Sequence, residues 1–413
     1  MNFVNSPPHT PKSVVIMMSL ILFDDNREHL KPLTYTRPVA ALRIGILTIK
    51  EKWERFLKLN ASYYTAPYLS EKFPTKYEAL NILINGSILP TAELCAFIQN
   101  DLPSNTLLMQ NGVAIALKTT KNTAEQFLAD DLKDIVTLET TLELTQVAYP
   151  WDLFKKNGAA IAADFDLLTA GRRSQPLSVS NRVIGDPNQI FLEEGAWVEC
   201  AILNTTNGPI YVGKNATIME GSIIRGGFAL CEGAVTKMAA KIYGPTTIGP
   251  YSKVGGEINN SVITGYSNKG HDGFLGNSVL GEWCNLGADT NNSNLKNNYA
   301  EVRVWNYKRN SFMPTGLQFC GLIMGDHSKS GINTMFNTGT VIGVSCNLFG
   351  GDFPRKFVPS FSWGSSKGFA TYQFAKATGT AERVMMRRNK AFDNVEKSIL
   401  NHIFNETESF RKY

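Results

Sequence analysis

The fold is decided by residues 212–255, which read VGKNATIMEGSIIRGGFALCEGAVTKMAAKIYGPTTIGPYSKVG. Every sixth position of this stretch is apolar with one exception, and glycines or small polar residues stand between them. These positions are Val212, Ile218, Ile224, Leu230, Thr236, Ile242, Ile248 and Val254. A period of six matches neither the 3.6-residue period of a helix nor the alternation of a simple strand. It is typical of a parallel β-helix, in which each coil has three flat faces and every sixth side chain stacks on the last.

The six-residue spacing continues in both directions from this stretch. It includes Ile184, Ile190, Ala196 and Ile202 before it, Phe274, Leu280 and Leu286 after it, and, more weakly, Ile342 and Leu348. A solenoid buries its apolar column only when several repeats stack. The sequence therefore predicts a β-helix domain over residues 180–360.

The bulk properties exclude several classes of protein. A length of 413 residues predicts two or three domains. The net charge of +5 is modest, so no nucleic-acid partner is predicted, while small anionic substrates fit. The six cysteines are scattered without a C-x-x-C pair, which argues against a disulfide framework or a structural zinc site and suits a reducing cytoplasm.

The remaining segments read as an α/β domain and a helical tail. The apolar run 14–23 has about ten residues, too few to span a bilayer, so it is interpreted as the first buried strand and no membrane partner is expected. Residues 1–18 are predicted to be a disordered leader. Strands and helices alternate over 19–170, which predicts a parallel-sheet α/β domain with a helical connector, and 361–413 is predicted to be a helical extension.

One histidine stands in the stretch richest in glycine and asparagine. His271 lies between Gly270 and Gly273, with the carboxylates Asp272 and Asp289 nearby in sequence. A neutral imidazole can accept a proton from an attacking amine or hydroxyl near neutral pH. The alternative is structural, with His271 capping a turn of the solenoid. Dense Gly and Asn favour the site, because they let backbone approach a ligand closely.

This region resembles the acetyltransferase half of the bacterial bifunctional enzymes that make UDP-N-acetylglucosamine. The matching elements are Gly270-His271, Gly276, Asn285-Leu286-Gly287-Ala288-Asp289-Thr290 and Ser293-Asn294-Leu295. The whole chain is similar to a divergent branch of that family from Bacteroidetes-type bacteria. The stretches that carry this likeness are Leu22–Asp25, Pro32–Pro38, Leu42–Thr48, Tyr149–Leu153 and Met324–Lys329.

The resemblance implies a left-handed β-helix, a homotrimer and a set of site residues. His271 would be the general base on the sugar amine, and Asn294 would bind the amino sugar. The family tyrosine is Phe274 here, and its paired lysines are Asn259-Asn260. Other cations would then bind the sugar phosphate, and the candidates are Lys269, Arg225 and Lys241. His327, Ser328 and Lys329 would lie near the acyl-CoA, with a structural turn as the alternative for His327.

The N-terminal domain resembles a sugar nucleotidyltransferase but departs from the usual pattern. The Gly-rich phosphate loop expected after the first strand is absent after Phe23. In its place stand Arg27, Lys31, Arg37 and Arg43, which are candidates for binding nucleotide phosphates. Asp24 and Asp25 are candidates for holding Mg²⁺. The alternative is a solvated loop without a site.

The sequence as a whole predicts a bifunctional transferase. One half would move acetyl from acetyl-CoA to glucosamine-1-phosphate, and the other would join UTP to N-acetylglucosamine-1-phosphate with Mg²⁺. A thymidylyltransferase acting on glucose-1-phosphate and a non-catalytic trimeric scaffold are the alternatives. A carbonic anhydrase of similar fold needs three zinc-binding histidines from the solenoid, where only His271 and His327 are available.

Overall fold

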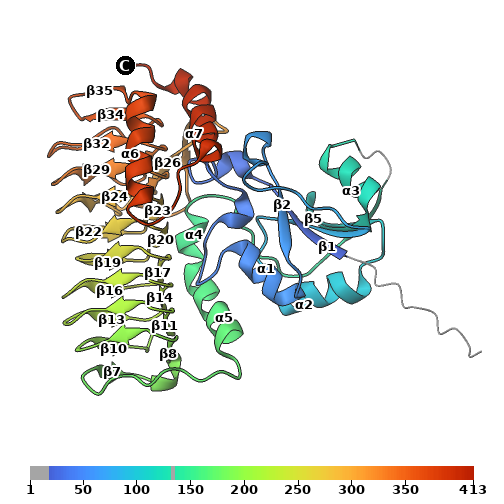
Figure 1. Cartoon of the computed structure of the whole chain (residues 1–413), viewed down its shortest axis with the longest axis horizontal. Coiled ribbons are helices and arrows are strands. Elements are labelled where there is room, and N and C mark those ends of the chain that lie inside the picture. The colour runs from blue at the N-terminus through green and yellow to red at the C-terminus, as the bar shows by residue number, and fades with distance from the viewer. Residues whose placement is uncertain (1–17, 132–134) are drawn as a thin grey trace, which may run out of the picture.

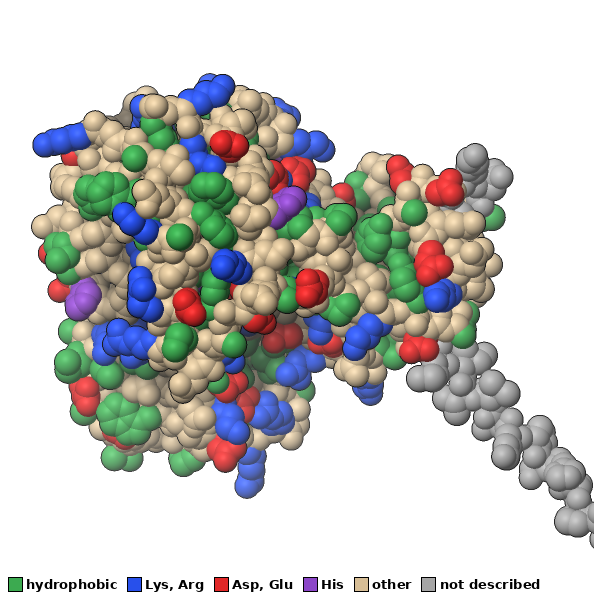
Figure 2. All heavy atoms as spheres, turned by 45° about the horizontal axis from the view of Figure 1, so that its top comes forward, with side chains coloured by type: hydrophobic (Ala, Val, Ile, Leu, Met, Phe, Trp, Pro, Cys, Tyr) green, Lys and Arg blue, Asp and Glu red, His purple; other side chains and the backbone are tan. Residues whose placement is uncertain are grey.

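The computed structural model describes residues 18–131 and 135–413. The expected disordered leader lies outside these residues, apart from Met18, which begins the first strand. The chain forms an N-terminal α/β domain, a long β-helix and two C-terminal helices (Figure 1). In a space-filling view the N-terminal domain projects from the β-helical body as a smaller lobe (Figure 2). No helix of the described part is long and apolar enough to cross a membrane.

The N-terminal domain is built on one six-stranded sheet with the order β2-β1-β3-β5-β4-β6. Its strands are β1 (Met18–Phe23), β2 (Ala61–Tyr64), β3 (Leu80–Asn85), β4 (Thr106–Gln110), β5 (Val113–Thr120) and β6 (Val136–Glu139). Its helices are α1 (Ile49–Leu57), α2 (Ala92–Ala96) and α3 (Lys121–Leu128), and the connector holds α4 (Asp152–Lys155) and α5 (Asn157–Thr169).

The α/β class is confirmed, but the sheet is mixed and not wholly parallel. Strand β5 runs antiparallel to both β3 and β4. The cause is the two-residue turn between β4 and β5, where Asn111 and Gly112 have φ values of 50° and 78°. An Asn-Gly turn with both φ angles positive closes a tight hairpin, and a hairpin makes its two strands antiparallel.

The left-handed parallel β-helix is confirmed, and three sheets form its faces. Face 1 contains β8 (Ile190–Leu192), β11 (Ile210–Val212), β14 (Phe228–Leu230), β17 (Thr246–Ile248), β20 (Val262–Gly265), β23 (Val279–Glu282), β28 (Leu322–Met324), β31 (Thr340–Ile342) and β33 (Phe357–Val358). Face 2 contains β9 (Trp197–Val198), β12 (Thr217–Ile218), β15 (Val235–Thr236), β18 (Lys253–Val254), β21 (Asn268–Lys269), β24 (Asn285–Leu286), β29 (Lys329–Ser330), β32 (Asn347–Leu348), β34 (Ser362–Ser365) and β35 (Gly368–Thr371). Face 3 contains β7 (Arg182–Ile184), β10 (Ile202–Asn204), β13 (Ile223–Arg225), β16 (Lys241–Tyr243), β19 (Glu257–Asn259) and β22 (Phe274–Gly276).

The six-residue repeat maps onto this architecture with one correction. All eight repeat positions between Val212 and Val254 are buried inside the coil. Side chains six apart do not stack, however, because they point inward from successive faces. Stacking joins residues eighteen apart in this stretch, so that Val212 lies opposite Leu230 and Leu230 opposite Ile248.

An inserted hairpin and the last α-helix of the chain contact the N-terminal domain. A small parallel pair, β25 (Asn291–Asn292) and β30 (Met335–Phe336), flanks an inserted hairpin of β26 (Arg303–Asn306) and β27 (Ser311–Pro314). The predicted C-terminal helical extension is confirmed as α6 (Phe374–Met386) and α7 (Asn394–Glu406). The residue Asn389 between them has a φ of 54°, a conformation that interrupts a helix. Lys31 of the N-terminal domain pairs with Glu406 of α7 at 2.6 Å.

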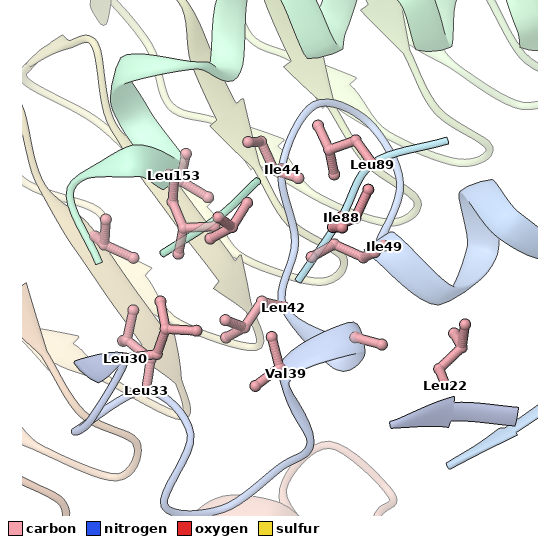
Figure 3. Close-up of a cluster of buried hydrophobic side chains, with 14 of the residues drawn as sticks. Leu22, Leu30, Leu33, Val39, Leu42, Ile44, Ile49, Ile88, Leu89 and Leu153 are labelled. Atoms are coloured by element: carbon pink, nitrogen blue, oxygen red, sulfur yellow. The ribbon is translucent and has the colours of Figure 1, made fainter. Parts of the chain in front are cut away.

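The outer side of face 1 is buried by the N-terminal domain and its connector. Val262, Val279 and Ile323 point outward from adjacent coils and belong to the same buried apolar cluster as the domain core. In Figure 3 leucine and isoleucine side chains from β1, from the segment 30–44 and from α4 converge within this cluster. The connector adds a buried polar anchor, because Asp164 of α5 accepts hydrogen bonds from the backbone of Ile46 at 2.8 Å and pairs with Lys52. The two domains therefore share an extensive interface.

Candidate functional site

The first candidate site lies at the carboxyl ends of β1, β2 and β3. These strands are parallel, so their ends meet at one edge of the sheet, which is where ligands bind in α/β folds. Asp24 and Asp25 follow β1 at this edge. Asp24 accepts hydrogen bonds from the Val39 backbone at 2.7 Å and from the Thr65 hydroxyl at 2.5 Å, and it pairs with Arg27 at 3.1 Å. These contacts occupy the carboxylate of Asp24 and hold the loop that follows β1.

Asp25 differs from Asp24 in having no salt-bridge partner among the described residues, although its carboxylate accepts from the Asn26 backbone N–H at 2.8 Å and the Asn26 side-chain amide at 3.3 Å. It accepts from the Asn85 amide at 2.8 Å and from the Gln146 amide at 3.3 Å. Burial raises the pKa of Asp24, against the lowering effect of Arg27 and the Thr65 hydroxyl. In the described residues no three His, Cys, Asp or Glu side chains gather as a metal cluster. Mg²⁺ in nucleotide sites is commonly held by one or two carboxylates together with the substrate phosphates, and Asp25 suits that arrangement.

The four cations predicted to bind phosphates are all engaged inside the protein. Arg27 pairs with Asp24, and Lys31 pairs with Glu28 and Glu406. A phosphate bound to either cation would have to replace one of these partners. Their role in phosphate binding stays a prediction.

The other two predicted cations point toward the β-helix. Arg37 pairs with Asp326 and, at 3.0 Å, with Glu282, and both partners belong to coils of the β-helix. Arg43 donates to the Ile46 carbonyl and lies 4.0 Å from the Cys231 sulfur. Both side chains are almost fully buried. This interface could not be predicted from the sequence, because an arginine on the surface and an arginine between two domains have the same local sequence pattern.

The second candidate site is the corner of the β-helix between β21 and β22. His271 and Asp272 are exposed there, and the imidazole makes no hydrogen bond with any described residue. The corner itself is held from the next coil, because the Asp289 backbone N–H donates to the Asp272 carbonyl at 3.0 Å. A free imidazole on a fixed loop is suited to accepting a proton from a ligand.

Phe274 and Asn294 converge beside this corner at Gly276. A Cβ on Gly276 would lie 2.4 Å from the Phe274 ring and 2.7 Å from the Asn294 amide nitrogen. The Asn294 side-chain amide donates to the side-chain oxygen of Asn277 at 2.8 Å. Glycine is therefore required here so that the aromatic ring and the amide can lie against the coil.

The three predicted sugar-phosphate cations are not close together. Lys269 points into the coil, where its amine donates to the His271 carbonyl at 2.5 Å. Lys241 and Arg225 lie outside on face 3, in the same sheet as Phe274 but two and three strands away from it. At about 4.8 Å between strands, Lys241 begins roughly 10 Å from Phe274. Within one chain, only Lys269 touches the His271 corner.

His327, Ser328 and Lys329 lie at a different corner, between faces 1 and 2. Tyr251, Tyr266, Trp283 and His327 form a ladder of parallel rings there. Burial lowers the pKa of His327 to about 3, so its ring is neutral. Ser328 donates to a carbonyl inside the coil, and the Lys329 amine donates to the His327 carbonyl at 2.9 Å. The ring of His327 lines a cleft of about 220 Å³ between the β-helix, α7 and Arg37.

A cluster of five cations lies beside the same ladder. Its members are Lys237, Lys253, Arg387, Arg388 and Lys390. None of them forms a salt bridge with a described residue. The pKa of Lys253 is lowered by partial burial and by repulsion from Arg388, Lys237 and Arg387. A hollow of about 220 Å³ opens between Tyr251, Tyr266 and the turn 388–390. Sequence analysis missed this cluster, because its members come from face 2 and from the turn after α6.

Residues 20–173 match the family model described as Sugar nucleotidyl transferase. The chain is also similar to proteins named "Bifunctional protein GlmU". The protein from Synechococcus elongatus is 23% identical over 274 residues, covering 61% of this chain and 56% of that protein. The protein from Methanocaldococcus jannaschii is 34% identical over 90 residues, covering 22% of this chain and 21% of its own length.

Two further proteins are similar to parts of this chain. A bifunctional sugar-1-phosphate nucleotidylyltransferase/acetyltransferase from Sulfurisphaera tokodaii is 34% identical over 95 residues, 23% of each chain. The polySia-specific acetyltransferase NeuO covers 47% of this chain and 86% of its own, at 14% identity and a TM-score of 0.25. The chain thus spans between about a fifth and about half of the length of the curated relatives. The predicted resemblance to bifunctional nucleotidyltransferase–acetyltransferase proteins is confirmed.

Proposed function

We propose that this protein is a bifunctional transferase that acetylates glucosamine-1-phosphate from acetyl-CoA and then joins the product to UTP. The observation that carries the proposal is the His271 corner, where the imidazole is exposed and makes no hydrogen bond with a described residue, and where Phe274, three residues on, lies with Asn294 against Gly276. The match of residues 20–173 to sugar nucleotidyl transferases supports the second activity. Each activity is assigned to its own domain.

In the acetyl transfer, the sugar amine attacks the thioester carbonyl directly. The nitrogen–carbon bond forms, the carbon–sulfur bond breaks, and the CoA thiolate leaves. His271 accepts the proton that the amine loses as it becomes an amide, and this proton can then pass to the thiolate. Asn294 is placed to bind the sugar through its amide. No covalent intermediate with the protein is needed, because proximity of the two substrates supplies the main acceleration.

The cation cluster beside the aromatic ladder suits the phosphate end of acetyl-CoA. Lys253 lies opposite Asn268 in face 2, and Asn268 is three residues before His271. Three extended residues span roughly 10 Å, so an extended thioester arm can run from the cluster to the corner. This assignment differs from the sequence prediction, which placed the acyl-CoA near His327, Ser328 and Lys329.

We also propose that the protein forms a homotrimer through face 3. Ile184, Ile202 and Ile223 are 44%, 38% and 48% exposed, and they line a hollow of about 350 Å³ together with Arg225 and Lys241. A contiguous apolar patch on a soluble surface commonly marks an interface. In such a trimer the face-3 cations of one subunit would lie near a neighbouring subunit, which offers a sugar-phosphate site that one chain lacks.

In the nucleotidyl transfer, Asp25 would hold Mg²⁺ at the carboxyl edge of the sheet. The metal would neutralise charge on the UTP phosphates when bound. Asn85 and Gln146 orient the Asp25 carboxylate through their amides.

The base assignment is tested with His271→Ala. Acetyl transfer is expected to fall by roughly 10²–10⁴-fold, the usual contribution of a general base, while nucleotidyl transfer and the melting temperature stay unchanged. Retained acetyl transfer in this variant would show that another group takes the proton.

A further inference from the structure

Lys269 occupies a position where the β-helix otherwise has interior side chains. It lies opposite Val254 in face 2, in the inward column that also contains Ile218 and Thr236. Its side chain is 2% exposed. Burial lowers the pKa of its amine to about 8, against the raising effect of Asp272 and Asp289, neither of which forms a salt bridge with it. A methionine or leucine would fit this column at lower cost.

The amine of Lys269 supplies a contact that the stacked coils do not. Neighbouring coils donate backbone N–H groups to the carbonyls of Lys269, Asp272 and Gly273. The carbonyl of His271, between them, receives no backbone donor from any described residue. Its one donor in the described part is the Lys269 amine at 2.5 Å. Hydrogen bonds from charged donors are stronger than neutral ones, so this contact fixes the corner firmly.

We propose that Lys269 is a positioning residue, whose amine holds the main chain of His271 so that the imidazole faces the bound amino sugar. This inference rests on the proposed role of His271 as general base. The sequence predicted that Lys269 contacts the sugar phosphate. In the present proposal, Lys269 acts instead from inside the coil. A small displacement of a catalytic group reduces the rate strongly, which explains why a buried charge is kept here.

The test compares Lys269→Met with Thr236→Val, a substitution in the same column two coils away. Both variants replace a buried polar group with an apolar one, and the Thr236 hydroxyl has no hydrogen-bond partner in the described residues. Both are expected to melt at or above the wild-type temperature. Only Lys269→Met should lower kcat for acetyl transfer, by about tenfold to a hundredfold, with KM for both substrates unchanged. Lys269→Gln, which retains an N–H donor, should lose less activity.

Amide hydrogen exchange at Asp289 and Glu257, whose N–H groups donate to the carbonyls of Asp272 and Gly273, gives a second readout in the full-length protein that needs no activity. Exchange should be faster in Lys269→Met than in wild type and unchanged in Thr236→Val. A raised KM with unchanged kcat would overturn the proposal in favour of a substrate contact. A lower melting temperature together with a lower kcat would overturn the proposal, because it would show that Lys269 only stabilises the fold. If wild type shows no acetyl transfer, the proposed function fails, while the exchange experiment still decides whether Lys269 holds the corner.

Discussion

Replacing Arg37 with methionine tests whether this arginine joins the two domains. Its guanidinium is buried against Asp326, whose side chain is 4% exposed, and against Glu282, whose side chain is 30% exposed. Burial alone would lower the pKa of Arg37, but Asp326 and Glu282 outweigh it and raise the pKa. In Arg37→Met, water can solvate Glu282, whereas Asp326 keeps a buried charge with the Thr36 hydroxyl at 2.8 Å and one backbone N–H as its remaining donors.

Removing one partner of a buried ion pair costs about 3–5 kcal/mol. We therefore expect Arg37→Met to lower the free energy of unfolding by that amount, measured by urea denaturation with tryptophan fluorescence. The matched control is Lys121→Met, which removes an exposed pair with Glu125 at 3.8 Å and should cost less than about 1 kcal/mol. The double variant Arg37→Met, Asp326→Asn should be more stable than the sum of its single variants predicts, by about 1 kcal/mol or more.

Two results would contradict the role of Arg37 in joining the domains. One is an Arg37→Met protein as stable as Lys121→Met. The other is a stable Arg37→Met protein that has lost nucleotidyl transfer alone, since that would restore the predicted phosphate-binding role.

Three more predictions follow from named contacts. The double variant Arg388→Ala, Lys390→Ala should raise KM for acetyl-CoA with little change in kcat. Added salt should also raise the wild-type KM for acetyl-CoA, because it screens the charges of the cluster. An unchanged KM in the double variant would show that the cation cluster does not bind acetyl-CoA. Ile161→Ala should lower the free energy of unfolding by about 2–5 kcal/mol, because Ile161 of α5 is fully buried where the connector covers face 1. The third concerns Lys269, whose pKa is lowered from 10.5 to about 8 in the folded protein. Between these values the unfolded chain binds more protons than the native state, so wild-type stability should rise with pH relative to Lys269→Met, by on the order of 3 kcal/mol; a flat difference across this range would contradict the burial of a charged amine.

The β-helix could be predicted because its signal is repeated. Each inward position, from Val212 to Val254, is set by the same requirement for an apolar side chain, so one stretch was enough to identify the architecture. The predicted stacking of residues six apart was wrong, and residues eighteen apart stack instead. A single sequence shows which residues point inward, but it does not show to which face each of them belongs. The antiparallel β5 could have been predicted from Asn111-Gly112, which is a strong hairpin signal.

The candidate sites were less predictable, since they depend on contacts between distant segments. Phe274 and Asn294 both lie against Gly276 because their motif is local to two adjacent coils. Arg37 and Lys31 meet partners more than two hundred residues away, and nothing in their own neighbourhood indicates those partners. The inward orientation of Lys269 follows from the strand register, which places it in the same column as Val254.

The proposed bifunctional activity is tested by assaying the purified wild-type protein in two reactions. One combines glucosamine-1-phosphate with acetyl-CoA and follows release of the CoA thiol. The other combines N-acetylglucosamine-1-phosphate, Mg²⁺ and either UTP or dTTP, and follows pyrophosphate. We expect thiol release in the first reaction and pyrophosphate from UTP in the second. Pyrophosphate from dTTP alone would indicate a thymidylyltransferase, and the absence of both products would contradict the proposed function and favour a scaffold.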